Sequence, residues 1–122
     1  MKIYETKLLH ADQRGRLVNL ISTGCWQEVN HIWSLAGTER GNHYHRQTRE
    51  LFYILCGYIQ ATVMNIRTGQ RTNIRLNPGM VVEIEQYELH TFVTETDAEW
   101  LNFLSEPMNE KNPDIQRLEH KP

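Results

Sequence analysis

Eight short runs rich in β-branched and aromatic residues occupy much of this chain, and they limit the folds that it can adopt. The runs cover residues 16–21, 29–35, 51–56, 58–66, 71–76, 80–84, 90–95 and 100–104. Turn-forming residues separate several of them, at Gly57, Thr68-Gly69, Asn77-Pro78-Gly79 and Thr96-Asp97. Many short strands with regular turns predict an all-β fold, an antiparallel barrel or double-sheet jelly roll.

The chain is long enough to bury a core, since it has 122 residues of which 39% are hydrophobic. It contains no apolar stretch that spans a bilayer and no secretion signal at its start, so we expect a cytoplasmic protein. Cys25 and Cys56 lack the spacing of a disulfide framework and are expected to be free thiols. From about residue 106 the chain is polar, and we expect a tail in which Ile115 and Leu118 form a short helical turn.

The charges of the chain exclude some classes of partner. The formal net charge is -2, from 13 basic and 15 acidic residues, and no block of like charges is present. This balance provides no basic surface for nucleic acid or for an anionic membrane, so a small molecule is the expected partner. Since the edge strands of a small barrel invite aggregation unless they are covered, we also expect a homodimer.

The densest group of chemically active side chains lies in residues 37–57, GTERGNHYHRQTRELFYILCG. His43 and His45 point to the same side of a strand, because successive side chains alternate between its two faces. Glu50 follows a polar turn at the head of the next strand, and His90 begins a later one. Three imidazoles and one carboxylate suit one divalent transition metal, Zn, Fe, Mn or Ni, with coordination positions left for substrate.

The remaining histidines and the nearby cysteine have weaker claims to a site. His10, His31 and His120 have no converging partners in the sequence and are expected to be structural. Cys56 shares the strand parity of Glu50, but it lies about 20 Å along an extended strand. We therefore exclude it as a ligand.

The spacing of these residues resembles the cupin superfamily. The first cupin motif is matched at every defined position by Gly37-x5-His43-x-His45-x4-Glu50-x6-Gly57. The second motif, G-x5-P-x-G-x2-H-x3-N, is matched at its ends by Gly79 and His90, but Glu85, Tyr87 and Thr94 replace its proline, glycine and asparagine. The resemblance implies one cupin domain over residues 1–122, an antiparallel double-stranded β-helix that holds a metal through His43, His45, Glu50 and His90.

A finer resemblance concerns cupins that act on nucleotide-linked keto-sugars. Arg40-Gly41-x-His43-x-His45, preceded by Asp12-x-Arg14-Gly15-x-Leu17, is similar to dTDP-4-dehydrorhamnose 3,5-epimerases, dTDP-sugar 3,4-ketoisomerases and the cupin domain of capsule-polysaccharide reductases. The segment NPDIQRLE resembles tails of the last group. The ketoisomerases usually lack the metal-binding carboxylate that Glu50 provides here, so the capsule-type domain is the closer relative.

The resemblance implies an epimerase or ketoisomerase that removes the C3 proton of a nucleotide-linked 4-keto-6-deoxy sugar. The ketone acidifies this proton, a metal stabilises the enediolate, and imidazoles or a phenol move the proton. We expect His43, His45 and Tyr87 to be catalytic. Arg40 and Arg14 are expected to bind the diphosphate. Two alternatives use the same donors: an Fe(II)-dependent dioxygenase, and a non-catalytic sensor or small-molecule-binding domain.

Overall fold

The structure is a computed structural model that describes residues 1–118, and these residues form an all-β fold. The strands are β1 (Lys2–Tyr4), β2 (Lys7–Asp12), β3 (Gly15–Asn19), β4 (Glu28–Ser34), β5 (Glu39–His43), β6 (Glu50–Cys56), β7 (Ile59–Asn65), β8 (Arg71–Leu76), β9 (Val81–Ile84), β10 (Glu88–Thr94) and β11 (Ala98–Leu104). No helix among the described residues has the length and apolarity to cross a membrane. The predicted fold class is confirmed.

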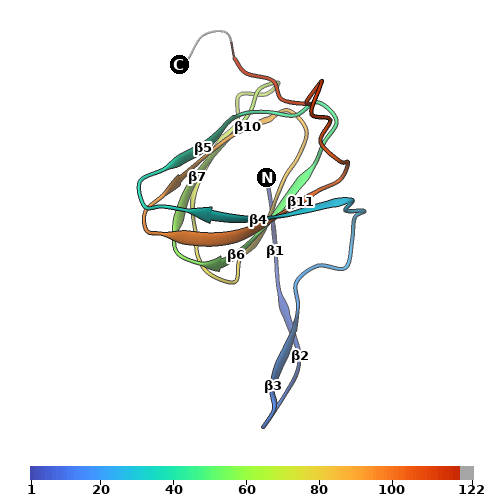
Figure 1. The fold of residues 1–122 in the computed structure, drawn as a ribbon, viewed down its shortest axis with the longest axis vertical. Helices are drawn as coiled ribbons and strands as arrows, with labels where there is room; N and C mark the ends of the chain where they lie inside the picture. Colours follow the sequence, from blue (N-terminus) through green and yellow to red (C-terminus); the bar gives the residue numbers. More distant parts are fainter. Residues whose placement is uncertain (119–122) are drawn as a thin grey trace.

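Two antiparallel sheets face each other and form the barrel (Figure 1). One sheet has the strand order β1-β9-β6-β11-β4, and the other has the order β5-β10-β7-β8. Strands distant in sequence are therefore neighbours, as the pairing of β6 with β11 and of β5 with β10 shows. This arrangement is the jelly roll that the sequence predicts, and each predicted strand overlaps an observed one.

Strands β1, β2 and β5 were not among the eight predicted runs. β1 has only three residues, and β2, KLLHAD, does not alternate between apolar and polar residues. β5, ERGNH, contains glycine and asparagine, which have low β propensity. It is a strand because β10 pairs with it, so its conformation depends on tertiary contacts rather than on its own composition.

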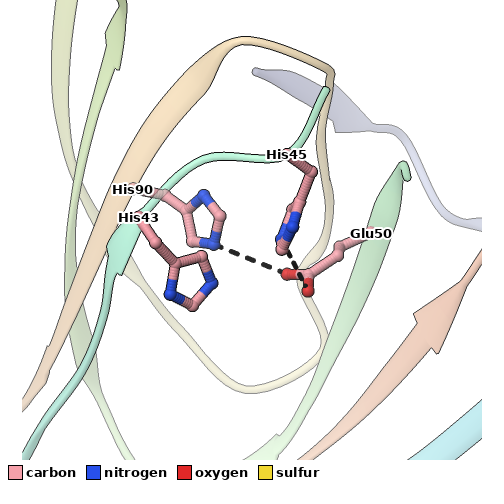
Figure 2. Close-up of side chains that lie close together, drawn as sticks. All are labelled: His43, His45, Glu50 and His90. Atoms are coloured by element: carbon pink, nitrogen blue, oxygen red, sulfur yellow. Dashed lines mark ion pairs between the residues drawn. The ribbon is translucent and has the colours of Figure 1, made fainter. Parts of the chain in front are cut away.

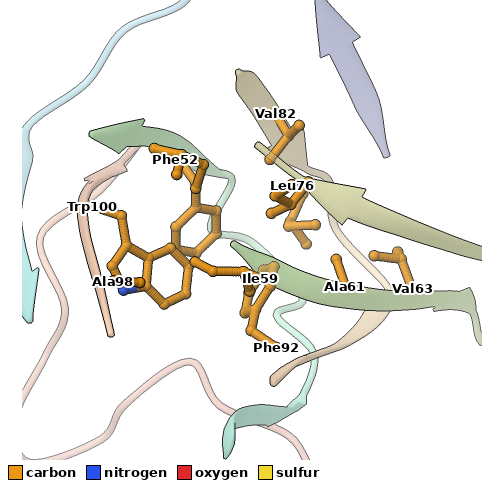
Figure 3. Close-up of a cluster of buried hydrophobic side chains, with 11 residues drawn as sticks. Phe52, Ile59, Ala61, Val63, Leu76, Val82, Phe92, Ala98 and Trp100 are labelled. Carbon is orange, nitrogen blue, oxygen red and sulfur yellow. The ribbon is translucent and has the colours of Figure 1, made fainter. Parts of the chain in front are cut away.

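The core lies between the two sheets and follows the two-residue period of the strands (Figure 3). Phe52 and Ile54 point inward from β6, and Phe92 and Trp100 do so from β10 and β11. The rings of Phe52, Phe92 and Trp100 pack against one another, with centroids 4.9 to 5.1 Å apart. This aromatic cluster lies next to the position of the predicted metal site, because the Phe92 ring centroid is 5.6 Å from that of His90.

Gly57, the last glycine of the first cupin motif, occupies a position where a side chain has no room. Its φ is 89°, and an added Cβ would meet the Asp97 carbonyl oxygen and lie 2.7 Å from the Ala98 Cα. Gly57→Ala is expected to lower the free energy of unfolding by about 2 to 5 kcal/mol, because a left-handed φ and a backbone clash both oppose it. Urea denaturation followed by circular dichroism measures this loss.

Gly69→Ala is the matched control for Gly57→Ala. Gly69 has a similar φ of 79°, but an added Cβ there would meet no atom within 4 Å. Only the conformational cost, about 1 to 2 kcal/mol, is expected. Equal losses for the two variants would contradict the close approach of Gly57 to the start of β11.

Strands β2 and β3 form a separate two-stranded sheet that projects away from the barrel (Figure 1). Leu8, Leu9 and Leu17 on this hairpin are between 52% and 60% exposed. Isolated hairpins are marginally stable in water. The hairpin therefore presents apolar surface that the barrel of the same chain does not cover.

Two further expectations concern the cysteines and the tail. Cys25 and Cys56 are exposed and unbridged, as predicted. The predicted helical turn at Ile115 and Leu118 is wrong, because Gln116 instead forms an isolated β-bridge with Tyr44. Backbone pairing with the barrel takes the place of local helical hydrogen bonds. His120 lies outside the described residues.

Candidate metal and substrate site

The candidate site lies where the inward faces of the strands change from apolar to polar. Glu50 lies on the inward face of β6, together with Phe52 and Ile54. His90 lies on the inward face of β10, together with Phe92. Glu50 is 7% exposed and His90 only 1%. A buried carboxylate and imidazole are costly unless they are paired with each other or with a ligand, so the position itself indicates a site.

A β-bulge directs His43 into the barrel. In the pairing of β5 with β10, Arg40 lies opposite Phe92, and Gly41 lies opposite Thr91. The next residue of β10, His90, lies opposite His43 rather than Asn42, so β5 has one extra residue at this point. Gly41 and Asn42 both have positive φ values, 94° and 59°, which accommodate the extra residue. Residues directly opposite each other point to the same face, so His43 points inward with His90.

The four predicted donors converge (Figure 2). His45 lies just beyond β5, in the loop that leads to Glu50 on β6. The imidazole centroids of the three histidines are 4.7 to 5.3 Å apart. One possible ligand atom from each of His43, His45, Glu50 and His90 lies within 4.8 Å of all the others. The structure therefore brings together the donor set that the sequence predicts.

The contacts of Glu50 indicate that the donors face a common point. Glu50 Oε1 lies 3.0 Å from His45 Nε2, and Glu50 Oε2 lies 3.6 Å from His90 Nε2. Although the first distance is short, His45 Nε2 is buried without a hydrogen bond of acceptable geometry. This is the geometry of ligand atoms around a common centre: the atoms are close together, but their lone pairs point to the centre and not toward each other.

Backbone carbonyls on the far side of two rings orient the imidazoles. His45 Nδ1 lies 2.5 Å from the Asp114 carbonyl oxygen, and His90 Nδ1 lies 2.9 Å from that of Glu88. A carbonyl only accepts, so each Nδ1 carries a hydrogen and donates it. In the neutral rings the lone pair is then on Nε2, which faces Glu50, and this is the arrangement typical of metal-ligating histidines.

His43 differs from the other two histidines. Its Nδ1 is buried without a hydrogen-bond partner, so no described group fixes its tautomer. The residue is half-buried and lines the cavity beside the cluster. Burial and the neighbouring His90 and His45 lower the pKa of His43 to about 4, so the ring is neutral near pH 7.

The charges of the cluster favour a cation at its centre. Burial raises the pKa of Glu50, but the neighbouring histidines outweigh it and lower that pKa, so Glu50 is an anion. Burial also lowers the pKa of His45, whereas the adjacent Glu50 outweighs it and raises that pKa. Burial lowers the pKa of His90. Near pH 7 the buried Glu50 anion therefore lies beside His43 and His90, whose rings are neutral, and a divalent cation at the centre would offset its charge.

The donor set fits a divalent transition metal. Ligands on opposite sides of such an ion, each about 2.1 Å from it, are separated by about 4.2 Å. The observed spread of at most 4.8 Å therefore needs only small side-chain movements. Two or three imidazoles with one carboxylate also match the preferences of Zn, Fe, Mn and Ni.

A cavity of about 120 Å³ opens beside the cluster. His43, Glu50 and His90 form its polar side. Its apolar wall consists of Ile32, Phe52, Phe92 and Trp100. Arg40 and Asn102 are its remaining polar groups. Drug-sized ligands generally occupy pockets of about 300 Å³ or more, so this cavity is suited to one part of a larger ligand.

Arg40 is held in position at this cavity. Its Nε donates to Ser34 Oγ at 2.9 Å, and its Nη2 donates to the Trp33 carbonyl at 3.3 Å. Ser34 Oγ also accepts a hydrogen bond from Trp100 Nε1 at 3.2 Å. Two hydrogen bonds to the end of β4 therefore orient this exposed side chain, while its remaining N–H groups are available for a ligand.

The structure does not bring Arg14 or Tyr87 to the cluster. Arg14 lies at the tip of the β2–β3 hairpin, where it pairs with Asp12 at 2.7 Å. The ring of Tyr87 stacks on Tyr44 and lies under the guanidinium of Arg67, 3.6 Å from its Cζ. Tyr87 does adopt the left-handed conformation, φ 62°, at the position where the second cupin motif has glycine. The departure from the motif thus preserves the turn before His90.

Asp114 supports the site and was not predicted from the sequence, and neither was Asn102 in the cavity wall. The Asp114 carboxylate accepts hydrogen bonds from the backbone of the loop between His45 and Glu50, and the Asp114 carbonyl orients His45. Burial raises the pKa of the Asp114 carboxyl, but the N–H groups of Arg46, Thr48 and Gln47 outweigh it and hold the pKa at about 2. The only signal in the sequence was the resemblance of the NPDIQRLE segment to capsule-type tails.

The jelly roll, with histidines and a glutamate that converge inside it, has the architecture of the cupin fold. More narrowly, the sequence profile of the Polysaccharide biosynthesis C-terminal domain family matches residues 10–115, and the chain belongs to this family. A UDP-2-acetamido-2,6-beta-L-arabino-hexul-4-ose reductase of Pseudomonas aeruginosa is 28% identical over 110 residues, which cover 87% of this chain. The chain spans about 30% of the length of that reductase.

Solved structures share the fold at low sequence identity. The capsular polysaccharide assembling protein CapF from Staphylococcus aureus is 22% identical, with a TM-score of 0.70 over 96% of this chain and 35% of CapF. The WlaRB TDP-quinovose 3,4-ketoisomerase from Campylobacter jejuni is 16% identical, with a TM-score of 0.79 over 96% and 92% of the two chains. A dTDP-4-dehydrorhamnose 3,5-epimerase from Bacillus anthracis is 18% identical, with a TM-score of 0.77 over 93% and 75%.

Proposed function

We propose that this domain is a metal-dependent epimerase or ketoisomerase that removes the C3 proton of a nucleotide-linked 4-keto-6-deoxy sugar. The observation that carries the proposal is a buried cluster of three histidines and a glutamate that opens on a small cavity with a fixed arginine. Support comes from the names of similar proteins, which include a 3,5-epimerase and a 3,4-ketoisomerase of nucleotide-linked sugars.

In this proposal His45, Glu50 and His90 hold the metal. His45 and His90 have the tautomer that places a lone pair on Nε2. Glu50 supplies the anionic oxygens between these two nitrogens. A bound divalent ion would polarise the C4 ketone and lower the energy of the enediolate. The choice among Zn, Fe, Mn and Ni is open to this donor set.

His43 moves the proton in this proposal. A base must be neutral before it accepts a proton, and burial keeps the His43 ring neutral; the same low pKa of about 4 makes the ring a weak base, so His43 acts on a C3 proton that the ketone and the metal have made acidic. It lines the cavity, and no described residue occupies its Nδ1. Protonation of C3 from the opposite face, by a water molecule rather than by His43, completes an epimerisation, whereas transfer of the proton from His43 to the C4 carbon, with the ketone formed at C3, completes a ketone migration.

Arg40 binds the nucleotide diphosphate. The cavity of about 120 Å³ accommodates a sugar ring but not a complete nucleotide sugar, so the diphosphate must lie outside it. Arg40 is the arginine at this cavity, and a guanidinium binds phosphate oxygens through two parallel hydrogen bonds. The fixed position of its side chain lowers the entropy lost on binding.

The test of the reaction is solvent exchange at C3. The purified protein, loaded with Zn, Mn, Ni or, without oxygen, Fe(II), is incubated in deuterated water with dTDP- and UDP-linked 4-keto-6-deoxyhexoses. Proton NMR is expected to show loss of the C3 signal, because epimerisation and ketone migration both begin with removal of that proton. No exchange with any sugar, in protein that retains its metal, would refute the proposed reaction.

We also propose that the domain forms a homodimer. The β2–β3 hairpin exposes leucines, and the edge strand β4 exposes Val29 and Trp33, which are 58% and 66% exposed. The hairpin projects away from its own barrel, so the two surfaces can cover each other only between two copies (Figure 1). Light scattering is expected to give twice the 14.4 kDa mass of the chain.

Variants of the hairpin test this proposed dimer. Leu8→Glu with Leu17→Glu is expected to give monomers, because both leucines are exposed on the hairpin and the charges would have to be buried on association. Thr68→Glu, in an exposed turn between β7 and β8, is the control. A wild-type mass of 14.4 kDa at micromolar concentration would contradict the dimer.

A further inference from the structure

The C-terminal segment 114–117 runs along the end of the barrel that carries the candidate site (Figure 1). Tyr44 and Gln116 exchange two backbone hydrogen bonds of 2.9 Å. The Arg117 guanidinium donates to the carbonyls of Gly41 and Asn42, each at 3.2 Å. The segment therefore contacts the chain on both sides of His43, including the two bulge residues with positive φ.

Asp114 makes the most numerous contacts in this segment. Its carboxylate accepts backbone hydrogen bonds from Arg46 at 3.0 Å, Gln47 at 2.9 Å and Thr48 at 2.8 Å. These are successive residues of the loop between His45 and Glu50. The Asp114 carbonyl accepts the hydrogen of His45 Nδ1. One residue thus binds both the loop that carries His45 and the imidazole ring itself.

We propose that Asp114 is a positioning residue that holds His45 in the orientation and tautomer with Nε2 toward Glu50. The loop between His45 and Glu50 lies outside both sheets, so strand pairing does not hold it. Tyr87 and Ser105 bind the backbone at the two ends of the loop, and the Asp114 side chain binds three successive N–H groups between them. The anchored backbone of Asp114 then places its carbonyl against Nδ1 of His45. His45 is consequently aligned before any ligand enters, as is expected for a site built from preorganised donors.

Asparagine is the informative replacement at position 114. It has nearly the shape of aspartate, but only one of its terminal atoms accepts hydrogen bonds, and its NH₂ group would face a loop N–H. Oδ1 accepts from Arg46 while Oδ2 accepts from Gln47 and Thr48, so Asp114→Asn must lose part of this set. The loop would shift, and the Asp114 carbonyl would no longer align with His45 Nδ1.

The experiment has two readouts, of which the first needs no metal. In metal-free protein at alkaline pH, long-range proton–nitrogen NMR of the imidazoles is expected to show Nδ1–H for His45 in the wild type and a mixture of tautomers in Asp114→Asn. Titration with Co²⁺, followed by its visible absorption, is expected to show affinity that is about ten- to a hundredfold weaker in the variant. Only this second readout rests on the proposed function.

Asp97→Asn is the control, because Asp97 accepts the backbone N–H of Ala36 at 2.9 Å in a different loop. It is expected to change neither readout. If Asp114→Asn does not fold, Arg117→Ala, which removes the two bonds to the bulge, is expected to weaken Co²⁺ binding and mix the His45 tautomers to a smaller extent.

Wild-type tautomer and Co²⁺ affinity in the folded variants would overturn the positioning role. If the wild type itself binds no Co²⁺, the proposed metal site fails, but the tautomer of His45 still decides the role of Asp114.

Discussion

Glu50→Gln is expected to lower the affinity for a divalent transition metal by at least about a hundredfold. Substitution of residues that only support the metal ligands lowers the affinity by up to about this factor, and loss of a ligand is expected to cost more. Glu50 supplies the only anionic oxygen among the four donors, and its two carboxylate oxygens lie 3.0 and 3.6 Å from His45 and His90. Glutamine preserves the volume but removes the charge. Isothermal titration with Zn²⁺ and metal analysis after dialysis measure the loss.

Glu99→Gln provides the matched control for Glu50→Gln. Glu99 also pairs with a histidine, His31, at 2.7 Å, but the pair is on the outer surface of the barrel. Its replacement is expected to leave metal content and Zn²⁺ affinity unchanged. Equal metal binding by wild type and Glu50→Gln would show that the cluster is not a metal site.

His43→Gln is expected to lower the rate of C3 proton exchange by about a hundred- to ten-thousandfold, the usual contribution of general acid–base catalysis. Metal binding is expected to persist, because His45, Glu50 and His90 remain and two of them keep their carbonyl partners. NMR gives the exchange rate, and metal analysis of the same sample gives the occupancy. Loss of the metal together with exchange would instead make His43 a ligand, as the cupin resemblance implies.

His10→Gln is the control for this variant, since His10 is an exposed histidine on the β2–β3 hairpin that pairs with Asp12 at 2.9 Å. Neither exchange nor metal content is expected to change. Retention of full exchange in His43→Gln would contradict a role for this residue in moving the proton or in holding the metal.

Strand parity explains why much of the site was predictable from the sequence. Glu50 and Phe52 share one face of β6, and His90 and Phe92 share one face of β10, so the positions of these polar residues follow from their apolar neighbours. The same parity argument, applied to His43 and His45, is wrong, because β5 ends at His43 and His45 lies in the following loop. Their convergence agrees instead with the spacing of the first cupin motif. These features depend on residues close together in sequence, which a single sequence displays directly.

The remaining features depend on contacts between segments far apart in sequence. The bulge at Gly41 and Asn42 is defined by the register with β10, and β5 has little strand propensity of its own. Asp114 reaches His45 across 69 residues, and nothing in its local sequence indicates a loop to bind. Tyr87 stands where the cupin motif has glycine, and it still adopts the left-handed conformation. Its ring packs against Tyr44 and Arg67, and these contacts cannot be read from the motif.

Deuterium incorporation at C3 tests the central claim most directly. Metal-loaded wild type, the same protein after removal of the metal, and Glu50→Gln are compared with dTDP- and UDP-linked 4-keto-6-deoxyhexoses in deuterated water. We predict exchange at C3 in the loaded wild type with at least one of these sugars, and its loss in the other two samples. Exchange that is equally fast in all three samples, or absent from the fully loaded wild type, would contradict a metal-dependent removal of the C3 proton by this domain.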